Sequence, residues 1–150
     1  MKKKLLYGLM GLVVALSLVG FVSCDDDDDD DEGASVVATY SYTYEAEGDE
    51  DEDYTESFYF YSDATFKVTY ESYTIATGTY TGDATSDGSV TLTVKKVAKG
   101  FIEESDDTSL IDWSDDYGDA SVTITISSGS FTIDSSYFDG YFYGETFTKQ

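Results

Sequence analysis

Two kinds of side chain offer reactive chemistry in this sequence, a single thiol and a large number of carboxylates. Cys24 is the only cysteine, so it cannot form a disulfide within its own chain. Histidine and arginine are absent, which excludes a Ser-His-Asp triad, the usual zinc sites and a guanidinium clamp for phosphate. Paired carboxylates, as in glycosidases, remain as a catalytic option. With 31 acids in the chain, their presence alone is not evidence for an active site. We therefore expect no enzymatic activity and no cofactor.

The segment that precedes Cys24 predicts export. Lys2–Lys4 are followed by 18 uncharged residues, Leu5 to Val22, and then by the small Ser23. A basic start, an apolar core and a small residue before the cut are typical of a secretory signal peptide. The apolar run also just reaches the length of a spanning helix, so an uncleaved signal anchor is the alternative. Both interpretations leave the rest of the chain outside the cytoplasm.

The residues around the thiol, Phe21-Val22-Ser23-Cys24, resemble a lipobox, where a type II signal peptidase cuts after lipid has been attached to the cysteine. Ser23 and Cys24 match the pattern, and Phe21 replaces the usual leucine, as is tolerated in Bacteroidetes and spirochaetes. The resemblance implies that residues 1–23 are removed and that Cys24 binds the membrane through its lipid. Each buried methylene contributes about 0.8 kcal/mol, so several acyl chains give a stable anchor.

Eight consecutive acids, residues 25–32, follow the cysteine directly. Like charges at this density repel one another, so we expect residues 24–33 to form an extended, solvated spacer. An acidic tract in this place resembles the surface-export signal of Bacteroidetes lipoproteins. It implies an outer-membrane anchor with the domain facing the cell exterior. The alternatives are a periplasm-facing domain and, by the enterobacterial convention, retention at the inner membrane. Calcium binding by the tract is not favoured, because the tract lacks a fixed ligand geometry.

The charge of the mature chain excludes several partners. Removing residues 1–23 removes three of the eight basic residues and none of the acids, which leaves a net charge of about −26. Nucleic-acid binding relies on basic residues that neutralise phosphates, so we exclude it. Docking of the domain onto anionic lipid is disfavoured for the same reason.

Residues 34–150 predict a single all-β domain. Apolar and polar residues alternate with a period of two, and Val, Ile, Thr, Tyr and Phe suit a pleated surface. Short turns between successive strands predict an eight-stranded antiparallel meander, closed into an up-and-down barrel or, alternatively, left as an open β-sandwich. A membrane barrel is not favoured, because its apolar face would point outward. The expected strands are 36–44, 54–61, 65–71, 73–81, 89–97, 121–127, 130–134 and 141–149.

Several of these segments resemble small lipocalin-like lipoprotein domains of Bacteroidetes. The similar segments are Phe58-Tyr59-Phe60, the acidic turn and Thr-Phe step of Ser62–Phe66, Gly78-Thr79-Tyr80 and the Thr-rich Asp87–Thr93. The resemblance implies a lipid-anchored module that binds a small apolar or glycan ligand. The only tryptophan, Trp113, lies in the long connection 98–119 and not in the first strand, where lipocalins have theirs.

The aromatic residues supply the candidate ligand-binding side chains. Trp113 would stack on a ligand if the connection 98–119 forms a lid. The alternative is a short helix or loop that plugs the end of the barrel with Phe101, Ile102, Leu110, Ile111 and Trp113. Inward-facing tyrosines either line a cavity or fill the core. The candidate ligand-binding residues are Trp113, Tyr40, Tyr42, Phe58, Phe60 and Tyr80, and the wider set of tyrosines adds Tyr44, Tyr59, Tyr61 and Tyr70.

Four carboxylates in the long connection, Asp112, Asp115, Asp116 and Asp119, are weak candidates for Ca²⁺, which takes six to eight oxygen ligands. The EF-hand pattern is not met, so a solvated acidic loop is favoured and no metal is predicted. Two functions remain. The first is a lipid-anchored module that binds a small ligand, and the second is a non-catalytic surface protein for adhesion, shielding or partner contact.

Overall fold

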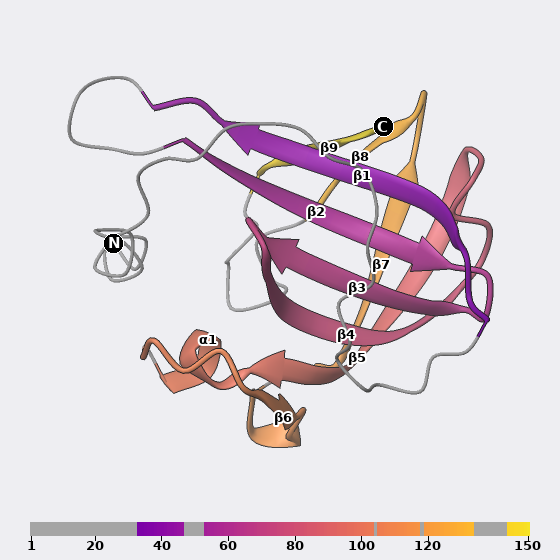
Figure 1. Ribbon diagram of the computed structural model, residues 1–150. Helices are drawn as coiled ribbons and strands as arrows, with labels where there is room; N and C mark the ends of the chain where they lie inside the picture. Colours follow the sequence, from indigo (N-terminus) through magenta and orange to yellow (C-terminus); the bar gives the residue numbers. More distant parts are fainter. Residues whose placement is uncertain (1–32, 47–52, 104, 118, 134–143) are drawn as a thin grey trace.

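The computed structural model describes residues 33–46, 53–103, 105–117, 119–133 and 144–150. The predicted signal peptide, the lipidation of Cys24 and most of the acidic spacer lie outside the described residues. The domain is all-β with antiparallel pairing, as predicted (Figure 1). Its elements are β1 (Val36–Tyr44), β2 (Tyr54–Tyr61), β3 (Thr65–Tyr70), β4 (Tyr73–Thr81), β5 (Gly88–Ala98), α1 (Lys99–Glu103), β6 (Leu110–Asp112), the 3-10 turn η2 (Asp115–Tyr117), β7 (Ser121–Ile126), β8 (Ser130–Thr132) and β9 (Thr146–Lys149).

Strand alternation sets which side chains are buried. In β7 the apolar Val122, Ile124 and Ile126 are buried, while the intervening Thr123 and Thr125 are exposed. The same alternation buries the predicted apolar faces of the other strands, because successive side chains of a strand point to opposite sides of the sheet. The buried apolar residues of these strands include Ala38, Tyr40, Phe58, Phe60, Phe66, Val68, Ala76, Val90, Leu92, Val94, Phe131 and Ile133.

The nine strands of the described residues belong to one curled sheet, which is not closed. The order is β6-β5-β4-β3-β2-β1-β9-β8, and β7 pairs with β5 beside β6. In Figure 1, β1 to β4 lie side by side while β5 and β7 pass behind them. Among the described residues, β7 and β8 meet only at the Ser127↔Ser130 bridge, next to the turn Ser128-Gly129. Closure of the predicted barrel is therefore not observed, and the open form is the one present.

The long connection contains more regular structure than the sequence indicated. Three residues of it form β6, which pairs with the end of β5 through Lys96↔Asp112, Val97↔Ile111 and Ala98↔Leu110. This strand raises the number from the predicted eight to nine. A short helix, α1, precedes it. The last strand is shorter than predicted, since β9 begins at Thr146, and residues 141–143 lie outside the described part of the chain.

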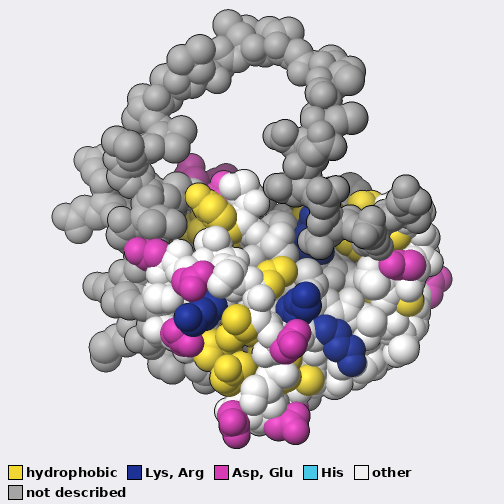
Figure 2. Space-filling model, turned by 60° about the horizontal axis from the view of Figure 1, so that its bottom comes forward, with side chains coloured by type: hydrophobic (Ala, Val, Ile, Leu, Met, Phe, Trp, Pro, Cys, Tyr) yellow, Lys and Arg dark blue, Asp and Glu magenta, His cyan; other side chains and the backbone are white. Residues whose placement is uncertain are grey.

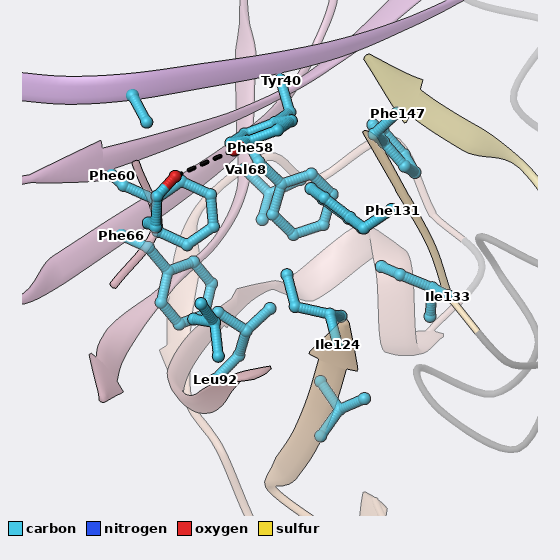
Figure 3. Close-up of a cluster of buried hydrophobic side chains, with 14 of the residues drawn as sticks. Tyr40, Phe58, Phe60, Phe66, Val68, Leu92, Ile124, Phe131, Ile133 and Phe147 are labelled. Carbon is cyan, nitrogen blue, oxygen red and sulfur yellow. Dashed lines mark hydrogen bonds between the residues drawn. The ribbon is translucent and has the colours of Figure 1, made fainter. Parts of the chain in front are cut away.

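Aromatic rings fill the middle of the interior (Figure 3). Phe58 on β2 contacts Phe131 on β8 and Phe147 on β9, with ring centroids 5.5 and 4.9 Å apart. Phe131 and Phe147 stack on each other at 5.2 Å, and Tyr40 contacts Phe131 at 5.2 Å. Each such pair contributes about 0.5–1.5 kcal/mol beyond the burial of its area. These contacts join the last strands of the sheet to its middle.

Gly78 allows β4 and β5 to approach each other closely. A β carbon at this position would overlap the backbone oxygen of Thr93 and lie 2.7 Å from the Phe66 ring. The glycine also pairs with Val94 next to a bulge in β5, where the register with β4 shifts. Only a residue without a side chain fits between this carbonyl and the ring.

We expect Gly78→Ala to destabilise the domain by about 1–3 kcal/mol or more, because the added carbon must displace backbone. Urea unfolding measures the change. The matched control is Thr79→Ala at the exposed neighbouring position, where only strand propensity, within about 1 kcal/mol, is altered. If Gly78→Ala is as stable as Thr79→Ala, the close approach is wrong.

Candidate functional site

One end of the interior is covered by the loop between β4 and β5. Ala84 of this loop is buried, and its carbonyl accepts a hydrogen bond from the Tyr40 hydroxyl at 2.9 Å. Figure 3 draws this bond inside the cluster of buried side chains. The Lys149 ammonium donates to the carbonyl of Thr85 at 2.7 Å and fixes the loop from the outside. Burial raises the pKa of Tyr40, so its hydroxyl keeps its proton at neutral pH and remains a donor. We name this the capped end.

Asp83 organises the loop at the capped end. Its Oδ1 accepts from the Thr85 backbone N–H at 2.8 Å and from the Thr85 hydroxyl at 2.6 Å, and its Oδ2 accepts from Ser86 at 2.8 Å. These bonds favour the charged carboxylate and lower the pKa of Asp83 below its ordinary value of 3.8. Asp63 and Asp107 hold their own turns in the same way, through Thr65 and Ser109.

The centre of the interior contains three of the candidate ligand-binding residues. Tyr40, Phe58 and Phe60 are fully buried and pack on other rings. Tyr80 is half-buried, contacts Phe60 at 5.1 Å and donates its hydroxyl to the Tyr61 carbonyl at 2.8 Å. These side chains form the packed core of the domain.

The sequence analysis included Tyr59 and Tyr61 among the inward-facing tyrosines, and the structure shows that this was wrong. They alternate with the buried Phe58 and Phe60 along β2, so they point to the outer face. The Lys67 ammonium lies over the Tyr59 ring, 5.4 Å from its centroid. The period of two already predicts that Tyr59 and Tyr61 point outward. Adjacent residues of a strand point to opposite faces, and both tyrosines are adjacent to the inward Phe60.

Four tyrosines gather at the opposite end of the interior, where β1 and β3 finish and β2 begins. Tyr54 stacks on Tyr44 and on Tyr70, both at 5.1 Å between centroids, and meets Tyr42 edge-on at 6.4 Å. Tyr54 is 8% exposed, whereas the other three are half-buried and so reach the solvent. We name this cluster of Tyr42, Tyr44, Tyr54 and Tyr70 the tyrosine end. In Figure 1 the last residues of β1 and β3 and the first of β2 lie on the left, away from the loop between β4 and β5.

Two buried carboxylates accompany the tyrosine end. Glu56 is 3% exposed, and its cross-strand neighbours are Tyr42 on β1 and Tyr70 on β3. Glu145 is 6% exposed and precedes β9 by one residue, two positions before the inward Phe147. The sequence analysis missed Glu56, Tyr54 and Glu145. Glu56 was detectable, because it shares the parity of the inward Phe58 and Phe60 along β2.

The long connection packs Trp113 and Phe101 against the core as half-buried residues. Trp113 also meets Tyr117 edge-on at 5.7 Å. The segment thus contributes a short helix and two aromatic side chains to one side of the core. The long connection covers the core only partly, since its Leu110 is 37% exposed. Figure 2 shows hydrophobic side chains reaching the surface on the side of α1 and β6, beside basic and acidic ones.

The structure does not bring the four weak calcium candidates together as a site. Asp112, Asp115, Asp116 and Asp119 are all described and all exposed. Within the described ranges, no group of three or more acids is placed to hold a metal ion.

Comparison with protein-family models, with curated proteins and with solved structures finds no match to this chain. In the part of the chain that the structure describes, no helix is both long enough and apolar enough to span a membrane. The site is therefore defined by its geometry alone, with a capped end, a filled centre, and a tyrosine end that contains two carboxylates.

We expect Asp83→Asn to lower stability at pH 7, because the neutral amide cannot reproduce the three bonds of the carboxylate. A lowered pKa in the folded state stabilises the fold above the ordinary pKa of 3.8, and this stabilisation is lost as the pH falls through the lowered value. The gap in urea midpoint between wild type and variant should therefore narrow as the pH falls below 3.8 and the carboxylate takes up its proton. The matched control is Asp87→Asn in the same loop. An equal gap at neutral and acid pH, or the same loss of stability in Asp87→Asn, contradicts the role of the Asp83 carboxylate in holding this loop.

Proposed function

We propose that this chain is a lipid-anchored cell-envelope protein that binds a small ligand at the tyrosine end of its β domain. The lipobox-like Phe21-Val22-Ser23-Cys24 supports the anchor, and the acidic run after it supports display on the cell exterior. The absence of histidine and arginine supports a non-catalytic role. The resemblance to lipocalin-like lipoprotein domains supports binding as the activity.

The observation that carries the proposal is the difference between the two ends of the interior. The capped end is covered by the loop around the buried Ala84, and the centre is filled by rings in direct contact. At the tyrosine end three half-buried rings reach the solvent. Ligand sites combine apolar and aromatic walls with a few polar groups, and this end has both.

A second candidate is a surface protein that acts through its exterior. The outer faces of the strands pair neutral hydroxyl groups with one another, as in Thr91–Thr123 and Thr93–Ser121 at 3.0 Å. Thr132–Thr146 at 3.1 Å and Ser41–Ser57 at 2.9 Å continue this pattern on other strands. A hydroxyl-covered and mostly uncharged wall supports adhesion or shielding, because it presents hydrogen-bonding groups without charge repulsion.

Native mass spectrometry of the protein isolated from its own host tests ligand binding. We expect a co-purifying small molecule, which should be lost from Tyr42→Leu, since this change removes a ring of the tyrosine end. Tyr73→Leu, at a 48% exposed tyrosine outside the cluster, is the control and should keep the ligand. A wild-type protein without any ligand, or retention by Tyr42→Leu, contradicts the proposed site.

Protease shaving of intact cells, combined with alkyne-palmitate labelling, tests anchoring and location. We expect the domain to be removed by protease and the wild-type chain to be labelled, because the lipid is placed on the thiol of Cys24. Cys24→Ala should abolish the label. Survival of a labelled domain after shaving contradicts display on the exterior, and labelling of Cys24→Ala contradicts the lipobox.

A further inference from the structure

We infer that the acidic run of the spacer, residues 25–32, binds to a lysine patch on the outer face of its own domain. The patch consists of Lys67 on β3 and of Lys95 and Lys96 on β5. The inference concerns how the domain is held on its tether, so it goes beyond the proposed ligand binding and does not depend on it. Most of the spacer lies outside the described residues, whereas every residue of the patch is described.

The strand register places two of the lysines on one row of the sheet. Lys67 is opposite Thr77 of β4, and Thr77 is opposite Lys96 of β5. Paired residues point to the same face and neighbouring strands are about 4.8 Å apart, so the α carbons of the two lysines are roughly 10 Å apart. Lys95 is the extra residue of the bulge next to Lys96, and both are exposed. Three positive charges therefore lie close together, and Figure 2 shows basic side chains gathered on the side of β5.

None of the three lysines of the patch forms an ion pair within the described residues. Lys99, by contrast, pairs with Glu103 and Asp107 at 3.6 and 3.7 Å. The Lys67 ammonium lies over the Tyr59 ring, 5.4 Å from its centroid, and this contact does not neutralise its charge. In a chain with 31 acids, the patch thus keeps positive charge that an anionic group can satisfy.

Acids are nearly absent from the described strands. The two exceptions are Glu56, which is buried, and Asp112 on the short strand β6. Lysine and glutamate disfavour strands to a similar degree, so propensity does not explain why lysines face outward here and glutamates do not. Apart from Asp112, which pairs with Lys96 in the register, no strand carboxylate on the outer face of the described chain opposes a negative partner.

The spacer can reach the patch from the point where the described chain begins. The Ser62 N–H, in the turn between β2 and β3, donates to the Ser35 carbonyl at 2.9 Å, and the Ser35 N–H donates to Ser62 Oγ at 3.1 Å. Lys67 is five residues beyond Ser62, which is at most about 17 Å. Eight extended residues span roughly 27 Å, so the acids of the spacer can extend from this turn across the row to Lys96.

Tethering favours the spacer over a separate anion. Residues 33–150 contain 23 of the 31 acids and five lysines, so the domain repels a free polyanion at long range. The spacer is already attached, and a short flexible linker gives an effective concentration of about millimolar. The Debye length at physiological ionic strength is about 8 Å, so the lysines of the patch act on a nearby spacer more strongly than distant acids do. Exposed ion pairs are individually weak, so the contact should depend on salt.

Binding of the spacer changes how the domain is presented. A solvated spacer, residues 24–33, allows the domain to stand up to roughly 30 Å from its anchor. A bound spacer shortens this distance and turns the outer faces of β3, β4 and β5 toward the anchor. The lysine patch thereby sets both the height and the orientation of the domain.

Carbodiimide cross-linking of the mature lipidated protein in detergent tests the inference. The reagent joins an amine to a carboxylate only where the two are in contact, and peptide mass spectrometry identifies each pair. We expect cross-links from residues 25–32 to the lysine patch at low salt, about threefold or more above those to Lys149. They should be lost at 1 M NaCl, where the Debye length is about 3 Å.

Lys149 is the control within the same molecule. It pairs with Tyr40 of β1, five residues after Ser35, so the spacer can reach it as well. Its ammonium donates to the Thr85 carbonyl at the capped end, away from the lysine patch. Equal cross-linking of Lys149 and the patch, or no cross-link from the spacer to the patch, overturns the inference.

A pair of double variants tests the same contact through the accessibility of the spacer. An aspartate-specific protease should cut the spacer about threefold faster in Lys67→Gln/Lys96→Gln than in the wild type, because the spacer is released. Lys99→Gln/Lys149→Gln removes the same charge outside the patch and should be cut at the wild-type rate. Equal rates in the two double variants overturn the inference. The cross-linking of the wild type needs no variant and stands if a variant does not fold.

Two further outcomes would assign the patch to another occupant and overturn the inference. In a mixture of isotopically light and heavy protein, cross-links to the patch that join a light and a heavy chain would identify a second copy. Acetylation of the patch lysines that is blocked in cells but not in the purified protein, with no cross-link to the spacer, would identify an anionic partner from the envelope.

Discussion

The contact among Phe58, Phe131 and Phe147 joins β8 and β9, at one edge of the sheet, to β2 in its middle. Backbone pairing between β7 and β8 is limited to one bridge in the described chain, so hydrogen bonds do not close the sheet. The rings of β8 and β9 instead pack on β2 in the middle, at centroid distances of 4.9–5.5 Å. This ring packing adds to the backbone pairing of β8, β9, β1 and β2, and it fills the centre of the interior. The same contact fixes the fold and moves any ligand site toward an end.

The two ends differ because the sequence places different residues there. At the capped end, Asp83, Ala84 and Thr85 form a turn whose carboxylate is satisfied locally and whose apolar residue enters the core. At the tyrosine end the inward positions of β1, β2 and β3 are Tyr and Glu, which combine apolar rings with polar tips.

Much of the fold follows from the sequence, because alternation with a period of two assigns each residue to one face. The strands β1, β2 and β4 have the predicted bounds, and the inward faces of β5 and β7 are as predicted. Three features required coordinates. Strand β6 pairs with β5 through a register that local pattern does not encode. The opening between β7 and β8 depends on contacts distant in sequence, as does the bond from Tyr40 to Ala84, 44 residues away. The inward Glu56 was missed because a charged residue is not expected inside a sheet. Its position, two residues before the inward Phe58, nevertheless assigns it to the interior.

The central claim is that ligands contact the tyrosine end and not the filled centre of the sheet. Ring-selective NMR of labelled tyrosine and phenylalanine, during a titration with the small molecule that co-purifies with the protein from its own host, tests this claim most directly. The account predicts shifts at Tyr42, Tyr44, Tyr54 and Tyr70, with Phe58 and Phe60 unchanged, because the central rings are fully buried and packed against one another. Shifts centred on Phe58 and Phe60, or the absence of shifts at the four tyrosines, would contradict it.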